Sequence, residues 1–376
     1  MPPTETETEA APAASSAPPH EYPPHHRLKD LAYFKNHLTL MPAHYTSVDI
    51  SRMTFAFFAL SALDLMSEIG NLDGGVKQGW VEWIYAQQIC DDGGGTLARC
   101  GFRGSPIAGA SFGTNSSIHA HGAAHITMTY TALACLLILG DDLGRVDVNG
   151  IVGALALLQV DSGSFKPTHD SDPIESDMRF LFCACVISFL LNDWRGVDKE
   201  KAISYILASQ GHDGAFGQGP GLEAHGGSTY CALASLSLLS SLDRLPNRVA
   251  LTHWLVLRQQ EEGGFNGRPG KDADTCYAFW VGGSLEILGA YDLIDTEALH
   301  TFLDSTRSKY GGFGKAVESY PDLMHANMGI AGLSIMRVPG LQRIHVPTAM
   351  TARTVGRLEG CVPWRKGKTV RDGETS

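Results

Sequence analysis

Three side chains of this 376-residue sequence could together bind a metal ion. Asp274 and Cys276 lie two residues apart, directly after a glycine-rich loop and before an apolar segment. At the start of a helix, a carboxylate and a thiolate with this spacing can turn toward one point, and the helix N-terminus lowers the pKa of the thiol. His325 lies near the start of another apolar segment, residues 323–336. One Asp, one Cys and one His would make a zinc site with a fourth position open to a substrate.

These residue types alone are weak evidence for a metal site, because an Asp-X-Cys pair is common and a single His is more often structural. The case depends on whether the elements that carry them bring them together. One pattern recurs along the chain: a segment that ends in Gln, an acidic or polar residue, and then Gly-X-Phe. The copies follow one another at intervals of roughly 50 residues, a period typical of repeat architectures. Four clear copies end at Phe165, Phe216, Phe265 and Phe313, and Gln87-Gln88 with Gly101-Phe102 form a looser first copy.

Each interval between these copies contains two segments with helical periodicity, for example residues 228–242 and 249–260. No sustained alternation of apolar and polar residues is present, so strands should be scarce. We predict an all-α fold, an α6–α6 toroid (alpha-alpha barrel) in which about six helix pairs with Gly-X-Phe turns close into a ring. An open solenoid is the alternative. The ring is favoured because the candidate inner helices carry aromatic side chains that suit a deep apolar cavity: Phe182, Tyr230, Tyr277, Phe279 and Trp280.

Basic residues gather at the same loops in three consecutive repeats. Arg268 and Lys271 directly precede Asp274, His225 lies one repeat earlier, and Lys315 lies one repeat later. Cations beside helix N-termini suit a diphosphate. Each of them alone is better explained as a solvated surface charge. Together, beside an apolar cavity, they indicate a ligand with an anionic head and a long hydrocarbon tail.

Composition bounds the domain organisation and the setting. Residues 1–27 are rich in Pro, Ala, Ser, Thr and Glu, which predicts a disordered tail. Residues 28–361 should form a single domain, and the polar residues 362–376 a loose C-terminal tail. Eight cysteines without a secretory signal favour a reducing, cytoplasmic setting. The net charge of −11 argues against nucleic-acid binding, and no apolar run is long enough to span a membrane.

Long segments of the chain, within roughly residues 38 to 338, resemble the β subunits of protein prenyltransferases. The resemblance rests on residues 266–280, which run from Asn-Gly-Arg-Pro to Asp-Thr-Cys-Tyr-Ala-Phe-Trp, and on residues 221–229, Gly-Leu-Glu-Ala-His-Gly-Gly-Ser-Thr. It also rests on residues 177–180, Asp-Met-Arg-Phe, and residues 140–146, Gly-Asp-Asp-Leu-Gly-Arg-Val. The stretch 101–121, which includes His119 and His121, departs from the pattern, and loop composition explains its histidines.

The resemblance implies a toroid embraced by a separate helical α subunit that this chain does not contain. It implies one zinc ion bound by Asp274, Cys276 and His325, with the cysteine sulfur of the substrate as the fourth ligand. The diphosphate would be held by His225, Arg268, Lys271 and Tyr277, together with a lysine of the α subunit. The substrate peptide would be held by His125, Thr127, Arg179, Phe180, Phe58, Met324 and Trp280.

Two positions indicate which member of the family the chain resembles. Thr54 stands where farnesyltransferases carry a Trp that blocks longer chains, so geranylgeranyl diphosphate (C20) is favoured over the C15 donor. Lys315 stands where farnesyltransferases carry a magnesium-binding Asp, so we expect that magnesium is not required. Both features resemble geranylgeranyltransferase type I, which acts on C-terminal CaaX sequences, CaaL in particular, in proteins such as Rho-type small GTPases.

Four other functions fit the sequence less well. The type II enzyme fits less well, because Arg179-Phe180 and His125 match the residues with which CaaX enzymes hold a peptide C-terminus. A farnesyltransferase β subunit is the alternative within the family. A terpene cyclase shares the ring but normally needs an Asp-X-Asp-Asp motif, which Asp170-Ser171-Asp172-Pro173 and Asp141-Asp142-Leu143 both miss. A non-catalytic helical-repeat scaffold would explain the apolar helices but not the zinc-type residues beside the cations.

Overall fold

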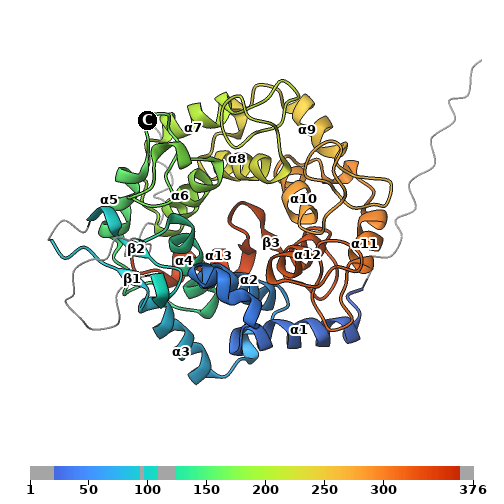
Figure 1. Cartoon of the computed structure of the whole chain (residues 1–376), viewed down its shortest axis with the longest axis horizontal. Coiled ribbons are helices and arrows are strands. Elements are labelled where there is room, and N and C mark those ends of the chain that lie inside the picture. Colours follow the sequence, from blue (N-terminus) through green and yellow to red (C-terminus); the bar gives the residue numbers. More distant parts are fainter. Residues whose placement is uncertain (1–20, 94–96, 109–123, 365–376) are drawn as a thin grey trace, which may run out of the picture.

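The computed structural model describes residues 21–93, 97–108 and 124–364. In this part of the chain, six inner helices form a closed ring, because each contacts the next and α12 returns to α2 (Figure 1). The inner helices are α2 (Arg52–Leu65), α4 (Ile126–Leu139), α6 (Met178–Leu191), α8 (Gly226–Leu238), α10 (Tyr277–Ile287) and α12 (Leu323–Ile335). The outer helices are α1 (Pro24–Thr39), α3 (Gly74–Tyr85), α5 (Val148–Leu158), α7 (Lys199–Ala208), α9 (Arg248–Val256) and α11 (Thr296–Ser305). The predicted α6–α6 toroid is confirmed, and the open solenoid is excluded.

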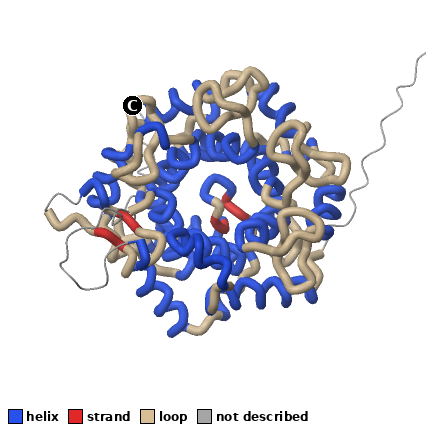
Figure 2. The backbone as a smooth tube through the Cα atoms, in the orientation of Figure 1, coloured by secondary structure: helices blue, strands red, loops and turns tan. Residues whose placement is uncertain are grey.

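Strands are as scarce as predicted in the described residues (Figure 2). The antiparallel strands β1 (Gln88–Ile89) and β2 (Gly101–Phe102) pair Gln88 with Phe102, which is the looser first copy of the repeat. The later copies make the same connection as isolated bridges, such as Gln159 with Phe165. The phenylalanine side chain is fully buried in all five copies. The Gly-X-Phe pattern is therefore a turn that anchors each helix pair to the core.

The recurring glutamine and the first glycine of the turn have separate structural roles. The side-chain amide of Gln159 donates to the carbonyl oxygens of Gly163 and Asp198, and its own oxygen accepts the N–H of Asp198, where α7 begins. Gly163 has φ of +98°, and a Cβ there would lie 2.1 Å from the carbonyl oxygen of Lys201. A residue without a side chain is therefore required where each turn touches the next outer helix.

The inner helices all begin at the same end of the ring, which we call the mouth. In five of the six repeats an N–H at the start of the inner helix, or directly before it, donates to a carbonyl in the loop that leads to the next inner helix. The sixth, the N–H of Leu323, donates to the hydroxyl of Tyr45, which lies before α2 and so completes the circle. The five backbone pairs are Met53–Gly104, Ile126–Pro167, Met178–Gln218, Gly226–Gly267 and Thr275–Lys315, at 2.8 to 3.0 Å.

The last repeat closes the ring against the first helix through buried charges. Arg307 takes the position of the repeated glutamine, and its guanidinium donates to Asp30 of α1 at 2.8 Å. Asp30 also accepts from the N–H of Gly312 and the hydroxyl of Tyr22. The side chain of Asp30 is 3% exposed, so these bonds replace the water that its carboxylate loses on burial. We call this the seam.

The end opposite the mouth is closed by the C-terminal segment, residues 338–364. The segment contains β3 (Ile344–His345), which pairs with β4 (Met350–Thr351), followed by α13 (Ala352–Gly356) and α14 (Leu358–Cys361). It contacts the last turns of inner helices: Gln342 donates to the carbonyl of Leu65, Arg357 to that of Leu137, and Trp364 to that of Leu191. Carbonyls that a helix end leaves unpaired are thereby satisfied.

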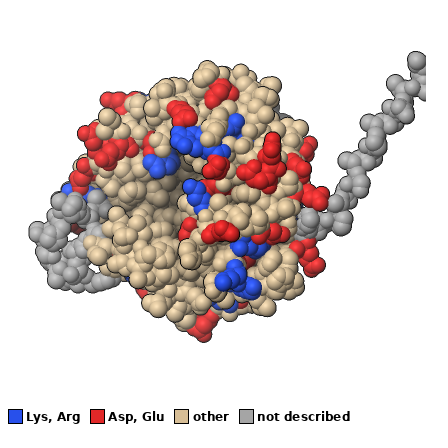
Figure 3. Space-filling model, turned by 45° about the vertical axis from the view of Figure 1, so that its right-hand side comes forward, with Lys and Arg blue, Asp and Glu red and all other residues tan. Residues whose placement is uncertain are grey.

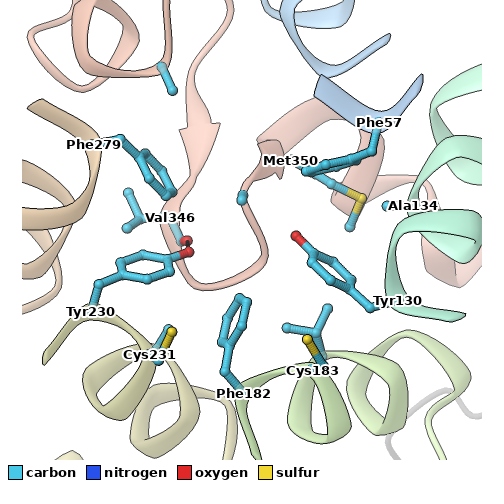
Figure 4. Packing of buried hydrophobic residues seen from close by; sticks show 14 of the residues in the cluster. Phe57, Tyr130, Ala134, Phe182, Cys183, Tyr230, Cys231, Phe279, Val346 and Met350 are labelled. Atoms are coloured by element: carbon cyan, nitrogen blue, oxygen red, sulfur yellow. Dashed lines mark hydrogen bonds between the residues drawn. The ribbon is translucent and has the colours of Figure 1, made fainter. Parts of the chain in front are cut away.

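Aromatic side chains of the inner helices point at the hairpin between β3 and β4 (Figure 4). The hydroxyl of Tyr130 donates to the carbonyl of Thr348 at 3.0 Å, and that of Tyr230 to the carbonyl of Val346 at 2.7 Å. Asp64, near the end of α2, accepts from Thr351, Thr354 and Arg353. Tyr130, Tyr230 and the hairpin residues Val346 and Met350 are all buried. At this end the interior of the ring is therefore filled with packed side chains.

Two predicted domain boundaries need correction. The tail was expected to end at residue 27, but Tyr22 is buried and α1 begins at Pro24, because Tyr22 and Asp30 belong to the seam. The C-terminal tail was expected to begin at residue 362, but Val362 is fully buried and Trp364 packs against α6. The remainder of both predicted tails, residues 1–20 and 365–376, lies outside the described residues.

Candidate functional site

Asp274, Cys276 and His325 meet at the mouth of the ring. One ligand atom from each lies within 4.8 Å of the other two, and all three residues are buried. Nε2 of His325 is 3.2 Å from Oδ1 of Asp274. Asp274 and Cys276 precede α10, and His325 lies in the first turn of α12, which contacts α10. Zinc takes N, O and S ligands at about 2.0 to 2.3 Å, so these atoms fit around one such ion after small movements.

The pKa values of Asp274 and His325 reflect the bond between these two groups. Burial acts to raise the pKa of Asp274, but bonds from His325 and Cys276 outweigh it and hold that pKa below its usual value. Burial lowers the pKa of His325, but the bonds to Asp274 and Asp322 prevail and raise it to about 9. Binding a metal here would displace the proton that Asp274 now shares with His325.

The thiol of Cys276 differs from the sequence prediction. Burial and the neighbouring carboxylate of Asp274 raise the pKa of Cys276 well above its usual value. The prediction that the helix N-terminus would lower this pKa is therefore wrong for the side chains by themselves, because desolvation of a 6% exposed thiol is the larger effect. A bound divalent cation is what would deprotonate such a thiol.

His225 and Tyr277 form a hydrogen-bonded pair beside the metal site. Nδ1 of His225 accepts the N–H of Gly227 at 3.0 Å, so the proton of the neutral ring is on Nε2. Nε2 lies 2.9 Å from the hydroxyl of Tyr277 and donates to it, which leaves the hydroxyl hydrogen free for another acceptor. Burial and Arg268 lower the pKa of His225, so it acts as a neutral donor rather than as the predicted cation. Gly267 lets the pair form, since a Cβ there would lie 2.2 Å from the Tyr277 hydroxyl.

The three remaining cations lie on the loops at the mouth, and Arg268 acts electrostatically on both His225 and Tyr277. Arg268 is half-buried and forms an ion pair with Glu223. Lys271 and Lys315 are exposed, and no ion pair of either ammonium group occurs among the described residues. Lys315 acts electrostatically on Cys276, so it lies close to the metal site. Lys and Arg side chains gather beside the hollow in this face of the molecule (Figure 3).

The residues predicted to hold a peptide lie on neighbouring inner helices. The rings of His125 and Phe180 meet edge to face at 5.8 Å, and the guanidinium of Arg179 lies 5.6 Å from the centre of the Phe180 ring. The guanidinium of Arg179 also donates to both carboxylate oxygens of Asp177. Burial, with Arg179 nearby, lowers the pKa of His125 to about 4, so this imidazole is neutral at pH 7.

The other predicted contacts are half-buried on the inner helices. The hydroxyl of Thr54 lies 3.4 Å from the sulfur of Met128, and that of Thr127 lies 3.6 Å from the thiol of Cys183. Thr54 and Phe58 are four residues apart and so share one face of α2. Trp280 is half-buried on α10, where its backbone N–H donates to the carbonyl of Cys276, and Met324 is half-buried at the start of α12.

Sequence reasoning missed two residues that support the metal site and one cavity. Asp322 and Tyr45 hold the start of α12, and the sequence signal for Asp322 was an acidic residue three positions before a candidate ligand. A cavity of about 530 Å³ lies outside the ring between α1, α2 and α3, lined by Trp80, Trp83 and Leu60 among others. Residues Gly101 and Phe102 of the unexplained stretch 101–121 form β2, whereas His119 and His121 lie outside the described residues.

Comparisons with known proteins agree with this geometry. The family model of the prenyltransferase alpha-alpha toroid domain matches residues 26–350. The geranylgeranyl transferase type-1 subunit beta of Arabidopsis thaliana is 39% identical, covering 83% of this chain and 85% of the relative. That of Dictyostelium discoideum is also 39% identical, covering 86% and 95%.

A solved structure with the same architecture is that of Candida albicans protein geranylgeranyltransferase-I complexed with GGPP. It superposes with a TM-score of 0.79 at 25% sequence identity, covering 89% of this chain and 98% of the other. The similarity extends over nearly the whole described ring, including all three metal-binding candidates. The chain therefore belongs to the protein prenyltransferase β-subunit family, which is built on the prenyltransferase alpha-alpha toroid domain.

Proposed function

We propose that the chain is the catalytic β subunit of a zinc-dependent protein geranylgeranyltransferase of type I. It would transfer a C20 group from geranylgeranyl diphosphate to the cysteine of a C-terminal CaaX sequence, CaaL in particular. The observation that carries the proposal is the convergence of Asp274, Cys276 and His325 at the mouth of a ring lined by aromatic side chains. Relatives 39% identical over most of their length carry the name of this enzyme's β subunit.

The residues at the mouth divide the chemistry between them. A zinc ion held by Asp274, Cys276 and His325 would lower the pKa of the substrate thiol, so that its thiolate forms at neutral pH. The thiolate attacks C1 of the isoprenoid, a C–S bond forms, and the C–O bond to diphosphate breaks. Arg268, Lys271 and the outward hydroxyl of Tyr277 would stabilise the negative charge that develops on the diphosphate. His225 would fix the Tyr277 hydroxyl in that orientation.

Lys315 supports a reaction that needs no magnesium. Its ammonium lies close enough to Cys276 to act on the thiol electrostatically, and it is exposed at the mouth. A fixed positive charge there would take the place of a magnesium ion on the diphosphate.

Thr54 supports the C20 donor, and it provides the test of the proposal. The chain, co-expressed with a type I α subunit, would be offered the C15 and C20 diphosphates in competition, with a CaaL peptide as acceptor. We expect C20 transfer by the unchanged chain and a shift toward C15 in Thr54→Trp, because the indole would shorten the space inside the ring that is proposed to take the isoprenoid tail. The control Thr39→Trp, at the exposed end of α1, should not change the preference. Transfer of neither group would contradict the proposed function.

A separate α subunit completes the proposed enzyme, with CaaX proteins such as Rho-type small GTPases as acceptors. The relatives are named as subunits, which supports a heterodimer. A reducing, cytoplasmic setting remains part of the proposal. No helix in the described part of the chain is long and apolar enough to cross a membrane.

A further inference from the structure

The first turn of α12, which carries His325, is held by two residues outside the predicted site. Four N–H groups at the start of a helix have no partner within the helix. Here the N–H of Leu323 donates to the hydroxyl of Tyr45, and those of Met324 and His325 donate to Oδ1 of Asp322. The N–H of Ala326 makes the first regular bond within the helix, to the backbone carbonyl of Asp322. Tyr45 and Asp322 thus satisfy three of the four unpaired donors, those of Leu323, Met324 and His325, which sets the direction in which the His325 side chain leaves the helix.

Asp322 uses its second oxygen differently from the first. Oδ2 lies 2.5 Å from Nδ1 of His325, while Nε2 of the same ring faces Asp274 at 3.2 Å. The two nitrogens of His325 are therefore assigned to different tasks. A carboxylate on Nδ1 keeps the ring proton there, so Nε2 presents a lone pair once the ring is neutral.

The other inner helices show that this arrangement is specific to α12. α6 is also capped by an aspartate, Asp177, but the remaining bonds of that carboxylate go to the guanidinium of Arg179. α4 and α8 are capped by the histidines His125 and His225. Among the described inner helices, α12 is the one whose capping carboxylate bonds to a metal-ligand candidate.

We infer that Asp322 is a positioning residue for the metal site, which holds Nε2 of His325 toward the ion. The inference rests on the zinc site of the proposed function. In this role Asp322 would contact His325 rather than the ion or the substrate. It acts through His325 by fixing the ring orientation, by keeping the proton on Nδ1 and by increasing the basicity of Nε2.

The simpler view is that Asp322 only caps α12, and the two roles respond differently to substitution. Asn caps a helix about as well as Asp, so Asp322→Asn should leave the fold of the metal-free chain nearly unchanged. Asp322→Asn also removes the negative charge of the carboxylate that lies beside Nδ1 of His325. Asp322→Ser keeps a capping oxygen too, but its side chain is too short to reach the ring as well. If Asp322 only caps α12, neither change should alter the affinity for the metal.

The test measures the zinc dissociation constant of the full chain by competition with a chromophoric chelator, and the visible spectrum of the Co²⁺-loaded chain. We expect about tenfold to a hundredfold weaker zinc binding in Asp322→Asn and Asp322→Ser, with altered Co²⁺ bands. Metal-free melting temperatures are recorded, and affinities are measured well below the lowest of them. Asp198→Asn, at the cap of α7, where the carboxylate accepts the N–H of Lys201, is the matched control and should bind zinc as the unchanged chain does.

The outcomes separate this inference from the function on which it rests. If the unchanged chain binds zinc and both Asp322 variants match it within threefold with the same Co²⁺ spectrum, Asp322 is only a cap and the inference is wrong. If the unchanged chain binds neither metal, the zinc site and the inference both fail. Transfer activity is recorded in parallel, since an active chain with unaltered Asp322 variants would leave the proposed function intact.

Discussion

The two ends of the ring are built from the same inner helices, yet they are used in opposite ways. At the mouth the helices begin, so their unpaired N–H groups and the positive ends of their dipoles face the opening. The candidate metal ligands, the cations and the Tyr277 hydroxyl lie there. At the closed end the helices finish, and their carbonyls accept hydrogen bonds from Gln342, Arg357 and Trp364 of the C-terminal segment. An anion is favoured at the first end and a cation at the second.

In this fold the polar groups at the mouth are available for chemistry, whereas those at the closed end contribute to stability. Polar groups at the mouth are held in place but keep bonding capacity for a ligand, as the Tyr277 hydroxyl does. Polar groups at the closed end are satisfied by the chain itself, as Asp64 is by three donors. Substitutions at the mouth should therefore change activity more than stability, and substitutions at the closed end should do the reverse.

The largest effect is expected for Cys276→Ala at the mouth. Loss of a metal ligand should remove the bound zinc and lower transfer about a thousandfold, since a metal ion supplies several kcal/mol to such reactions. Binding of the isoprenoid diphosphate should remain, because the cations are intact. Metal content and single-turnover transfer measure this. A variant with full activity would refute the assignment of the site.

At the closed end, Asp64→Ala should lower the free energy of unfolding by about 3 kcal/mol, because two buried hydroxyls lose their acceptor. Urea unfolding measures the change, and kcat per folded molecule should stay close to that of the unchanged chain. Asp243→Ala, at an exposed position, is the control and should be nearly neutral. A loss of kcat without a loss of stability would contradict the view that Asp64 at the closed end serves stability alone.

The repeat predicted the ring, and the repeat together with the resemblance to prenyltransferase β subunits predicted the candidate metal triad. Each Gly-X-Phe turn leads into an inner helix, so Asp274 and His325, one repeat apart, had to meet at one end. The seam and the closed end had no such signal. Arg307 replaces the repeated glutamine, and its partner Asp30 is 277 positions away in the sequence. The protonation of Cys276 and the role of Asp322 depend on burial and orientation, which a sequence pattern does not contain.

Lys315→Asp tests whether the mouth depends on fixed cations. Exchanging the ammonium for a carboxylate should lower transfer without magnesium roughly tenfold to a hundredfold, the worth of one charged hydrogen bond. Added magnesium should restore much of it. A magnesium titration of the variant measures this effect, with Lys309→Asp from the preceding exposed loop as the control. A variant insensitive to magnesium would show that residue 315 does not face the diphosphate.

The smallest effects are expected for the two tyrosines that hold the hairpin. Tyr130→Phe and Tyr230→Phe should each cost about 1 kcal/mol of stability, since a buried carbonyl loses its partner. The two changes act on separate carbonyls, those of Thr348 and Val346, so the double variant should lose about the sum. Urea midpoints measure this, and Tyr310→Phe, on an exposed side chain, should have no effect. A loss of activity larger than the loss of stability would mean that the hairpin contributes to the mouth.

The seam has a consequence for how the chain is made. During synthesis α1 leaves the ribosome early, whereas Arg307 emerges only when most of the chain has been translated. Until then Asp30 lacks its cation, and the apolar inner faces of the first repeats have no closed ring to cover them. The ring cannot close before residue 307 is available, and a partly made chain that exposes these apolar faces is prone to aggregate in the interval. A premature stop codon before residue 307 leaves an open arc that no later step can close.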